Sequence, residues 1–214
     1  MAMAKVHPQL LFPSSSSSST SYHTSKQETF TVWLKSLVLN GKGCTVFDSN
    51  GRIVYRVDNY NCKASDEIFL MDLKGKVLFT ILRKQWKLLG FWEGYRPSMS
   101  GGGGEASKSK KRPGFQVRKT LVGMFGGGDS TCKVTAEGLD KNQQSHDFKI
   151  QSWSNNSICK IVDKSGDLIA EVRRKQLSCG IVLGEDVLTM VVQPHVDHSL
   201  IMAIVIVYMH ALMN

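Results

Sequence analysis

The sequence predicts a mainly β fold, an antiparallel barrel of about twelve strands that encloses a hydrophobic C-terminal helix. Two features of the chain lead to this prediction. Short apolar, β-branched and aromatic runs alternate with turn residues from position 30 to position 193, and residues 200–209 are ten apolar residues in succession. An open sheet of so many strands would curl or split, and a helix that is apolar on every side must be surrounded, so the two features fit together as a closed barrel around a helix.

A turn motif that occurs three times is the most informative local feature. Asp72-Leu73-Lys74-Gly75 recurs as Asp163-Lys164-Ser165-Gly166 and, earlier in the chain, as Asp48-Ser49-Asn50-Gly51. In each copy the Asp side chain can bond to the turn backbone and the Gly can adopt a positive φ, which predicts a tight hairpin. The apolar residues two, four and six positions after each Gly then share one face of the outgoing strand. The motif predicts hairpins, and none of its residue types performs chemistry at this spacing.

The other strands follow from the same alternation of apolar runs and turn residues. Short connections favour antiparallel neighbours throughout. We expect strands at residues 30–39, 44–48, 52–58, 66–71, 77–83 and 87–95, and then at 115–125, 132–137, 146–153, 157–162, 168–174, 178–183 and 187–193.

A single folded domain is expected over residues 28–214, because 214 residues are enough for one substantial core. Residues 1–27 contain six consecutive serines and no acidic residue, which predicts a disordered Ser-rich tail. Residues 97–114 contain four consecutive glycines and no apolar periodicity, which predicts a flexible basic loop between the two halves.

The apolar run at 200–209 is predicted to be the central helix. At about 1.5 Å per residue it reaches about 15 Å, roughly half of a bilayer's hydrocarbon core, so transmembrane insertion is not expected. The polar residues at 197–199 are suited to cap the start of a helix. A buried strand remains an alternative, because the Ile-Val-Ile sequence at 204–206 is a good strand former. His210 is expected to interact with the helix C-terminus or with solvent at the barrel mouth.

The net charge of +9 is concentrated in one part of the chain. Residues 69–120 hold twelve Lys or Arg and three acidic residues, so the remainder is neutral. Such an excess favours an anionic partner, either phospholipid head groups or nucleic acid, although a solvated surface that aids solubility explains it as well. The five cysteines show neither zinc spacing nor a Cys-x-x-Cys motif, so we expect reduced thiols, with no disulfide framework and no metal.

Three separated segments resemble the plant LURP-one-related family: TVFDSNGRIVYRVDNY at 45–60, FLMDLKGKVLFTILRKQW at 69–86 and DVLTMVVQPHVDHSLIMAIVIVY at 186–208. The likeness extends over roughly residues 28 to 210. It implies a tubby C-terminal-like fold, kinship with phosphoinositide-binding tubby proteins and with phospholipid scramblases, a plant stress or defence setting, and no established enzymatic reaction. The resemblance assigns no role to the glycine-rich loop or to the serine tract.

A basic cluster at strand ends and hairpin turns is the strongest candidate site. Phosphoinositide binding needs several cations that converge on multiply charged phosphates. The alternative is that outward strand positions carry Lys and Arg to protect edges and maintain solubility. Arg83 shares the parity of the inward side chains, which predicts that it lies at the barrel rim, follows a bulge, or pairs internally. The cluster consists of Lys74, Lys76, Arg83, Lys84 and Lys87, with Arg173, Arg174 and Lys175 in the second half.

The remaining motifs give weaker hypotheses. Lys108, Lys110, Lys111 and Arg112 resemble a nuclear-localisation segment and would equally serve as a nonspecific membrane tether. The two imidazoles and the carboxylate at 195–198 suggest metal ligation, but a turn and helix cap is favoured. Gly-x-Ser-x-Gly and phosphate-loop motifs are missing, so no catalytic residue and no cofactor are expected. The RNP signature is missing too, and no specific nucleic acid is expected.

Two functions of different class remain open. The first is a non-enzymatic tubby-like module that binds anionic phospholipid or phosphoinositide at a membrane surface. The second is a protein-interaction or nuclear regulatory module with an unidentified protein partner and no lipid ligand. An enzyme ranks third. We expect a cytoplasmic monomer, peripheral at the plasma membrane in the first case or nuclear in the second; organelle targeting is less well supported because residues 1–26 contain no Arg.

Overall fold

A computed structural model describes residues 22–35, 43–62, 65–86, 89–97, 112–119, 131–137, 146–152, 157–177 and 179–212. Within these ranges the chain forms twelve strands and one helix. The strands are β1 (Glu28–Trp33), β2 (Cys44–Phe47), β3 (Ile53–Cys62), β4 (Ser65–Asp72), β5 (Val77–Trp86), β6 (Leu89–Tyr95), β7 (Phe115–Lys119), β8 (Thr131–Ala136), β9 (His146–Ser152), β10 (Ser157–Asp163), β11 (Leu168–Arg174) and β12 (Val187–Val192), and the helix is α1 (His198–Leu212).

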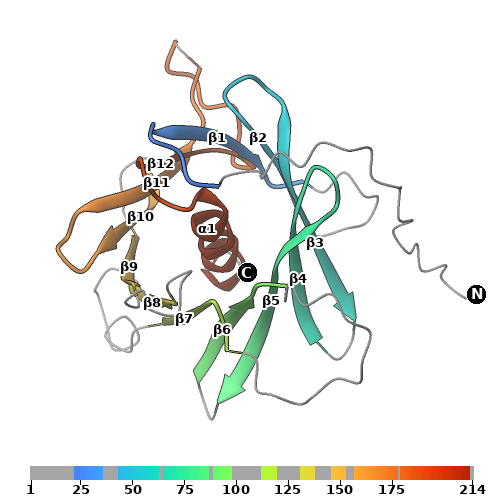
Figure 1. Cartoon of the computed structure of the whole chain (residues 1–214). Helices are drawn as coiled ribbons and strands as arrows, with labels where there is room; N and C mark the ends of the chain where they lie inside the picture. The colour runs from blue at the N-terminus through green and yellow to red at the C-terminus, as the bar shows by residue number, and fades with distance from the viewer. Residues whose placement is uncertain are drawn as a thin grey trace, which may run out of the picture.

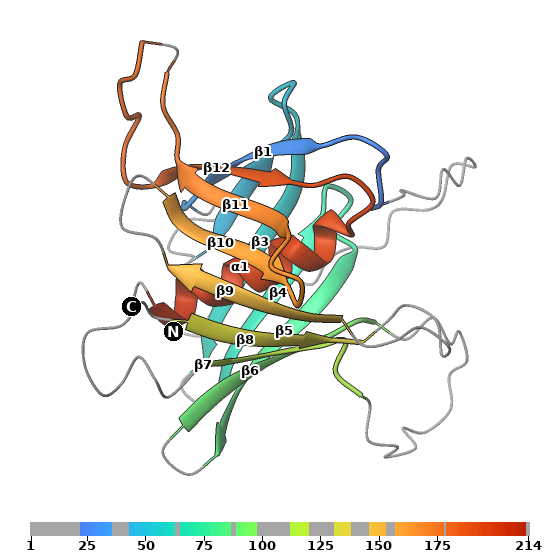
Figure 2. The same ribbon diagram turned by 90° about the vertical axis from the view of Figure 1, so that its left-hand side faces the viewer.

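The strands form a closed antiparallel barrel, which confirms the predicted fold class. Each strand pairs with its neighbours in sequence, and the barrel closes because β1 pairs with β12 as well as with β2. The closing pair runs from Glu28 opposite Val192 to Trp33 opposite Val187. Figure 1 looks along the barrel and shows α1 in the middle of the ring of strands, and Figure 2 shows the helix lying along the interior.

The two ends of the barrel differ, because the start of α1 and the repeated turns lie at one of them. We call the end at which α1 begins the front end, because it faces the viewer in Figure 1, and the opposite end the back end. Tyr55 near the start of β3 pairs with Asp72 at the end of β4, and Ala170 pairs with Val192 just ahead of the helix. The three repeated turns therefore all lie at the front end.

The repeated turns have the predicted geometry. Gly51, Gly75 and Gly166 adopt positive φ angles of 76°, 78° and 91°. Asp48 Oδ1 accepts the backbone N–H of Asn50 and of Arg52, each at 2.8 Å. Equivalent bonds join Asp72 Oδ1 to Lys76 N at 2.9 Å, and Asp163 Oδ1 to Ser165 N at 2.8 Å and Asp167 N at 2.9 Å. Each turn thus satisfies its own backbone donors, as the sequence predicts.

The helix is the centre of the core. All nine side chains from Ile201 to Met209 are at most 7% exposed. They face inward strand residues such as Leu70, Phe79 and Ile161, which are fully buried. The helix is confirmed rather than the buried strand, and it extends beyond the predicted run to His198–Leu212. An apolar segment with no polar face is stable here because the barrel surrounds it on every side.

Some boundaries differ from those predicted. The strand expected at 178–183 does not form, because a tight turn closes there: Leu177 O accepts the N–H of Gly180 at 2.8 Å, and Gly180 has a φ of 82°. Tyr22 and His23, assigned to the Ser-rich tail, contact the barrel, where Tyr22 stacks on Tyr55 at 6.4 Å. Residues 1–21 of the tail and 98–111 of the basic loop lie outside the described residues.

Candidate functional site

The structure divides the predicted basic cluster between the two ends of the barrel. Lys74 and Lys76 are exposed in the β4–β5 turn at the front end, whereas Arg83 and Lys84 lie toward the back end of β5. Arg83 is exposed although it shares the parity of Phe79 and Ile81, as expected for a residue at the rim. Arg173, Arg174 and Lys175 also lie at the back end, where β11 finishes. Lys87, Lys108, Lys110 and Lys111 lie outside the described residues, and Arg112 is exposed ahead of β7.

A different set of basic side chains lies in one row across the outer wall. Lys84 pairs with Phe91, Phe91 with Arg118, Arg118 with Lys133, and Lys133 with Lys149. Residues directly opposite each other in a sheet project from the same face. Phe91, Arg118, Lys133 and Lys149 project outward, because their sequence neighbours Trp92, Val117, Val134 and Ile150 are buried. Lys84 shares this face because it pairs with Phe91. We call Lys84, Phe91, Arg118, Lys133 and Lys149 the basic row.

The basic row is compact and has few acidic neighbours. At about 4.8 Å per strand, five adjacent strands place its ends about 19 Å apart. The Arg118 guanidinium lies over the Phe91 ring, 5.0 Å from its centroid, and donates to Gln116 Oε1 at 3.2 Å. The next row toward the front end carries two acidic residues, Glu93 and Asp147. Lys133 reaches Asp147 at 3.8 Å, a surface pair of small energetic weight.

Glu93, the other acidic neighbour, accepts hydrogen bonds at both carboxylate oxygens. Its Oε1 accepts from Gln116 Nε2 at 2.7 Å and its Oε2 accepts from the Tyr95 hydroxyl at 2.5 Å. Burial, the hydrogen bond to Glu93 and the charge of that carboxylate raise the pKa of Tyr95 to about 12, so the phenol remains a donor. The basic row therefore presents its cations outward with little neutralisation from its own sheet.

Sequence reasoning found Lys84 but missed Arg118, Lys133 and Lys149 as its partners. The four basic residues come from four strands, and they lie at the same level of the barrel only because of the register in which the strands pair. The signal that could have revealed them is a Lys or Arg on the outward parity of each of β5, β7, β8 and β9. Parity alone does not show that the four residues share one level of the barrel.

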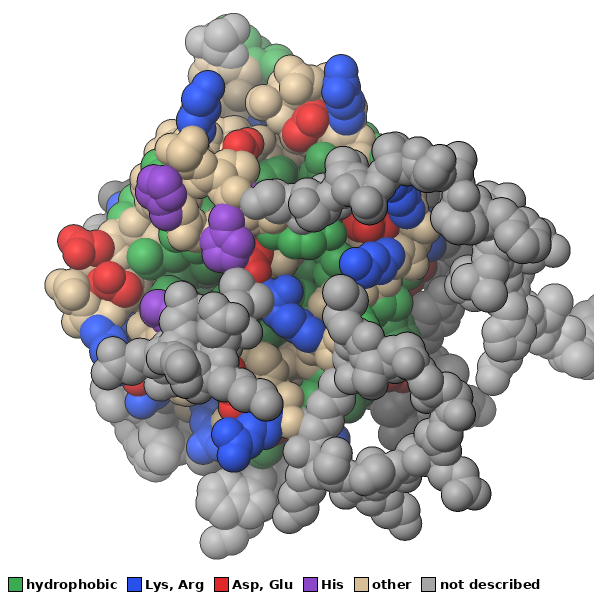
Figure 3. All heavy atoms as spheres, viewed as in Figure 1, with side chains coloured by type: hydrophobic (Ala, Val, Ile, Leu, Met, Phe, Trp, Pro, Cys, Tyr) green, Lys and Arg blue, Asp and Glu red, His purple; other side chains and the backbone are tan. Residues whose placement is uncertain are grey.

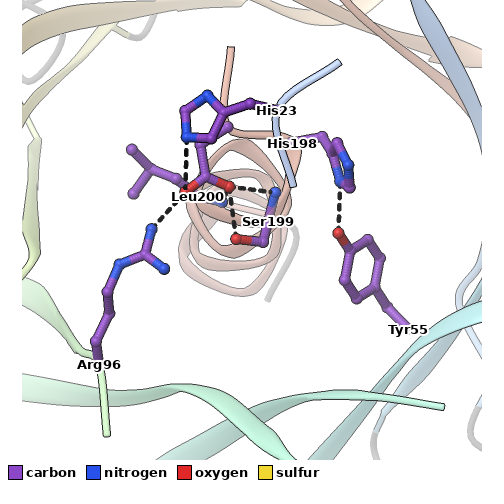
Figure 4. A network of polar contacts seen from close by, with 7 residues as sticks. His23, Tyr55, Arg96, His198, Ser199 and Leu200 are labelled. Atoms are coloured by element: carbon purple, nitrogen blue, oxygen red, sulfur yellow. Dashed lines mark hydrogen bonds and ion pairs between the residues drawn. The ribbon is translucent and has the colours of Figure 1, made fainter. Parts of the chain in front are cut away.

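A second polar site closes the front end, around Asp197 at the start of α1 (Figure 4). Asp197 Oδ1 accepts the N–H of Ser199 at 2.9 Å, the N–H of Leu200 at 3.2 Å and the Ser199 hydroxyl at 2.6 Å. Its Oδ2 lies 2.5 Å from Nη2 of Arg96 and 4.0 Å from Nε2 of His23. This is the geometry of a helix cap, and it confirms that reading of residues 195–198. Figure 3 shows histidine, acidic and basic side chains gathered at this end.

The electrostatics of this front-end network are those of a structural site. Burial acts to raise the pKa of Asp197, but hydrogen bonds from Ser199 and Leu200 and the charge of Arg96 outweigh it, and the pKa is lowered. Burial lowers the pKa of His198, whose Nδ1 lies 2.5 Å from the Tyr55 hydroxyl. Burial and the Asp197 charge raise the pKa of Tyr55, so Tyr55 is the donor. The network is a carboxylate–guanidinium pair beside a neutral imidazole.

Three further titratable side chains, His210, Cys44 and Cys159, also have structural surroundings. At the back end, His210 Nε2 lies 3.2 Å from Asn59 Nδ2, and its ring meets the edge of Trp92 at 5.7 Å. Burial raises the pKa of Cys44 and of Cys159 to about 12, with smaller contributions from neighbouring charged groups. Thiols of this kind are poor nucleophiles and poor metal ligands.

A metal site and a membrane-spanning helix are both missing from the described residues. They hold no group of three His, Cys, Asp or Glu side chains close enough to bind a metal ion. Nor do they hold a helix with the length and apolar character needed to cross a bilayer.

The fold and the site together define a helix-threaded β-barrel with a basic outer wall. The sequence model of the LURP-one-related family matches residues 28–209, and the chain belongs to that family. It is 42% identical to protein LURP-one-related 11 of Arabidopsis thaliana over 99% of this chain and 89% of that protein. It is also 42% identical to LURP-one-related 3 of the same plant, over 96% of this chain and 91% of that one.

The fold is also that of a solved structure. The X-ray structure of Arabidopsis thaliana protein AT5G01750 superposes with a TM-score of 0.56 at 20% sequence identity, over 87% of this chain and 91% of the other. At this identity the likeness shows the shared fold alone. The names of the family and of these relatives do not indicate an enzyme.

Proposed function

We propose that this protein is a non-enzymatic binding module that attaches peripherally to anionic phospholipid, including phosphoinositide, through the basic row. The observation that carries the proposal is the alignment of Lys84, Arg118, Lys133 and Lys149 on one level of a rigid wall. Cations fixed in this way meet several phosphates at once without the entropic cost of ordering a loop. The setting that the family resemblance implies is a plant stress or defence response.

The charge of the row is large enough to bring about attachment. A basic residue near an anionic surface contributes about 1 kcal/mol, so four cations acting together change the binding constant by up to about a thousandfold. The interaction is screened over about 8 Å at physiological ionic strength, so binding should fall steeply as salt is added. Phe91 lies between the cations and is half-buried, which lets its ring reach the interfacial region of a bilayer.

The test is co-sedimentation with vesicles of phosphatidylcholine alone, with phosphatidylserine, and with a phosphoinositide. The test variant replaces Lys84, Arg118, Lys133 and Lys149 with Gln. The control variant replaces the front-end residues Lys26, Arg52, Lys74 and Lys76 with Gln, so that both variants lose the same net charge. All eight side chains are exposed or half-buried, so both variants should keep the fold.

We expect the wild-type protein and the front-end variant to bind the anionic vesicles and the basic-row variant to lose binding. Equal losses in the two variants would show that net charge matters and the row does not. Failure of the wild-type protein to bind anionic vesicles above neutral ones at low salt would refute the proposal. The protein-interaction or nuclear regulatory module would then be the better hypothesis.

A further inference from the structure

The connection between β11 and β12 is a hairpin that stands away from the barrel wall (Figure 2). It spans residues 175–186, of which all but position 178 are described. Figure 2 shows it projecting beyond the strands at the back end, the end at which α1 finishes. We call it the 175–186 hairpin.

Exposed apolar side chains are concentrated on this hairpin. Among the described residues six large hydrophobic side chains are exposed, and four of them lie between positions 177 and 183. Leu177 is 46% exposed, Ile181 62%, Val182 41% and Leu183 45%. The other two, Leu73 and Leu168, lie at the front end beside repeated turns. Isolated exposed apolar residues are ordinary, but a cluster on a projecting element indicates an interaction surface.

The hairpin has a defined conformation of its own. Leu177 N donates to Ile181 O at 2.9 Å, and Leu183 N donates to Lys175 O at 3.0 Å. Gln176 and Val182 form an isolated bridge between its two arms. Because these bonds lie within the hairpin, the apolar side chains are presented without any strand of the barrel covering them.

Basic residues surround the base of the hairpin. Arg173 and Arg174 are exposed at the end of β11, and Lys175 donates through Nζ to Thr31 Oγ1 at 2.5 Å. The acidic residues at the base are Glu185 and Asp186. Glu185 lies 3.5 Å from Arg174, and Asp186 lies 3.1 Å from Lys35 and accepts from Trp33 Nε1 at 3.3 Å. Cations therefore outnumber carboxylates directly behind the apolar tip.

We propose that the 175–186 hairpin inserts its apolar tip into the surface layer of an anionic membrane, with the cations at its base on the lipid phosphates. This inference rests on the anionic-lipid ligand of the proposed function but not on its contact surface, because the hairpin leaves the barrel from β11 and β12 whereas the basic row lies on β5–β9. It identifies a separate lipid contact, a segment that enters the bilayer. An apolar tip backed by cations has the polarity profile of the lipid interface, where hydrocarbon lies beneath a layer of phosphate. The four apolar side chains offer less surface than the roughly 600 Å² or more that each partner of a stable protein interface buries, so they suit a lipid surface better than a protein partner.

The first experiment labels Cys179, which is exposed at the tip of the hairpin, with an environment-sensitive fluorophore. Cys44, Cys132 and Cys159 are buried, and replacing Cys62 with Ser leaves Cys179 as the thiol that reacts. Mixed phosphatidylcholine and phosphatidylserine vesicles should shift the emission to the blue, and a lipid-borne quencher in the acyl region should reduce its intensity. An emission spectrum that does not change under conditions in which the protein sediments with vesicles would overturn the inference.

The second experiment compares two matched double variants. Ile181→Ser with Leu183→Ser removes two exposed apolar side chains from the hairpin, and Leu73→Ser with Leu168→Ser removes two from the front end. The hairpin variant should lower the vesicle partition coefficient about tenfold or more, because burial of apolar area contributes to insertion, and the front-end variant should leave it unchanged. Equal partitioning of the two variants would overturn the inference.

The outcomes separate this inference from the proposed function. If neutralising the basic row abolishes binding but the Cys179 probe does not respond and the two serine variants partition alike, attachment is electrostatic and the hairpin does not insert. If the probe responds and the hairpin variant binds weakly while the basic-row variant binds normally, the hairpin inserts and the row is not the site. If the wild-type protein binds no anionic vesicle, both proposals fail.

Discussion

Arg96, which follows β6, holds Asp197 at the start of α1, with Nη2 2.5 Å from Oδ2. The two residues are 101 positions apart in the sequence. The Arg96 guanidinium also lies over the Phe79 ring, 4.4 Å from its centroid. The contact joins the first turn of the central helix to the barrel wall, so the position of the helix along the barrel depends on a charged pair as well as on apolar packing.

Replacing Asp197 with Ala should lower the free energy of unfolding by about 2–3 kcal/mol. The substitution removes the helix cap and leaves Arg96 without its carboxylate, although the Arg96 side chain is one-third exposed and water will recover part of the loss. Urea unfolding followed by circular dichroism measures the change. His23→Ala is the control, since His23 is 4.0 Å away and half exposed, and it should change stability by less than about 0.5 kcal/mol. A loss from Asp197→Ala no greater than that control would show that the pair is not stabilising.

Stability should decline in two steps as the pH is lowered. The pKa of His198 is lower in the folded protein, so its neutral form contributes fully above about pH 6.5 and the contribution is lost as the pH falls through the folded pKa. The pKa of Asp197 is lowered too, so its contribution is present above about pH 3.9 and is lost below that value.

Melting temperatures measured from pH 8 to pH 3 test the order of these steps. His198→Gln keeps a polar side chain near Tyr55 but cannot titrate, so it should flatten the profile between pH 7 and pH 5 and leave the acidic step in place. An unchanged profile in this variant would assign the first step to another group.

Replacing Ile204 with Asp should unfold the domain. Ile204 is completely buried in the middle of α1, and an unpaired carboxylate there costs several kcal/mol, a large part of the stability of a typical domain. Leu73→Asp introduces the same carboxylate at a side chain that is 70% exposed and should change stability by less than about 0.5 kcal/mol. Circular dichroism distinguishes the two, and a folded Ile204→Asp protein with an unchanged melting temperature would contradict a central helix.

Two glycines should differ sharply when replaced by Ala. A Cβ on Gly94 would lie 1.9 Å from Cε1 of Phe115, a buried ring, so Gly94→Ala must displace the core and should cost several kcal/mol. Gly75 has open space around it, and Ala there would bear only the strain of a φ of 78°, about 1–2 kcal/mol. Denaturant unfolding of both variants measures the difference. Similar losses would mean that Phe115 turns away at little cost.

The hairpin turns and the central helix could be predicted from the sequence, because each depends on residues that are close together in the chain. Each repeated Asp-x-x-Gly turn contains the acceptor and the permissive backbone that it needs, so its hairpin is apparent before any neighbour is known. The apolar run of α1 is likewise continuous in the chain. The basic row depends on pairing across five strands, and a shift of one residue in any of them would turn one of its side chains inward. No local pattern specifies that alignment.

The prediction of a strand at 178–183 was wrong for a related reason. Its apolar residues have strand propensity, but propensity does not show whether a neighbouring strand will cover them. Gly180 closes a turn that leaves Ile181 exposed. The misread segment is the one that carries the exposed apolar surface, because the sequence pattern of a buried strand and that of an apolar tip are the same.

The position of α1 in the chain also determines the order in which the protein can mature. All twelve strands precede the helix, so a nascent chain exposes their inward faces before the segment that fills the barrel has left the ribosome. Until then the strands can pair with one another, but nothing covers their inward apolar side chains, and these exposed faces favour aggregation. The core is therefore completed only after every wall strand has been made, and a chain that stops before His198 would carry all the wall strands without the segment that fills them.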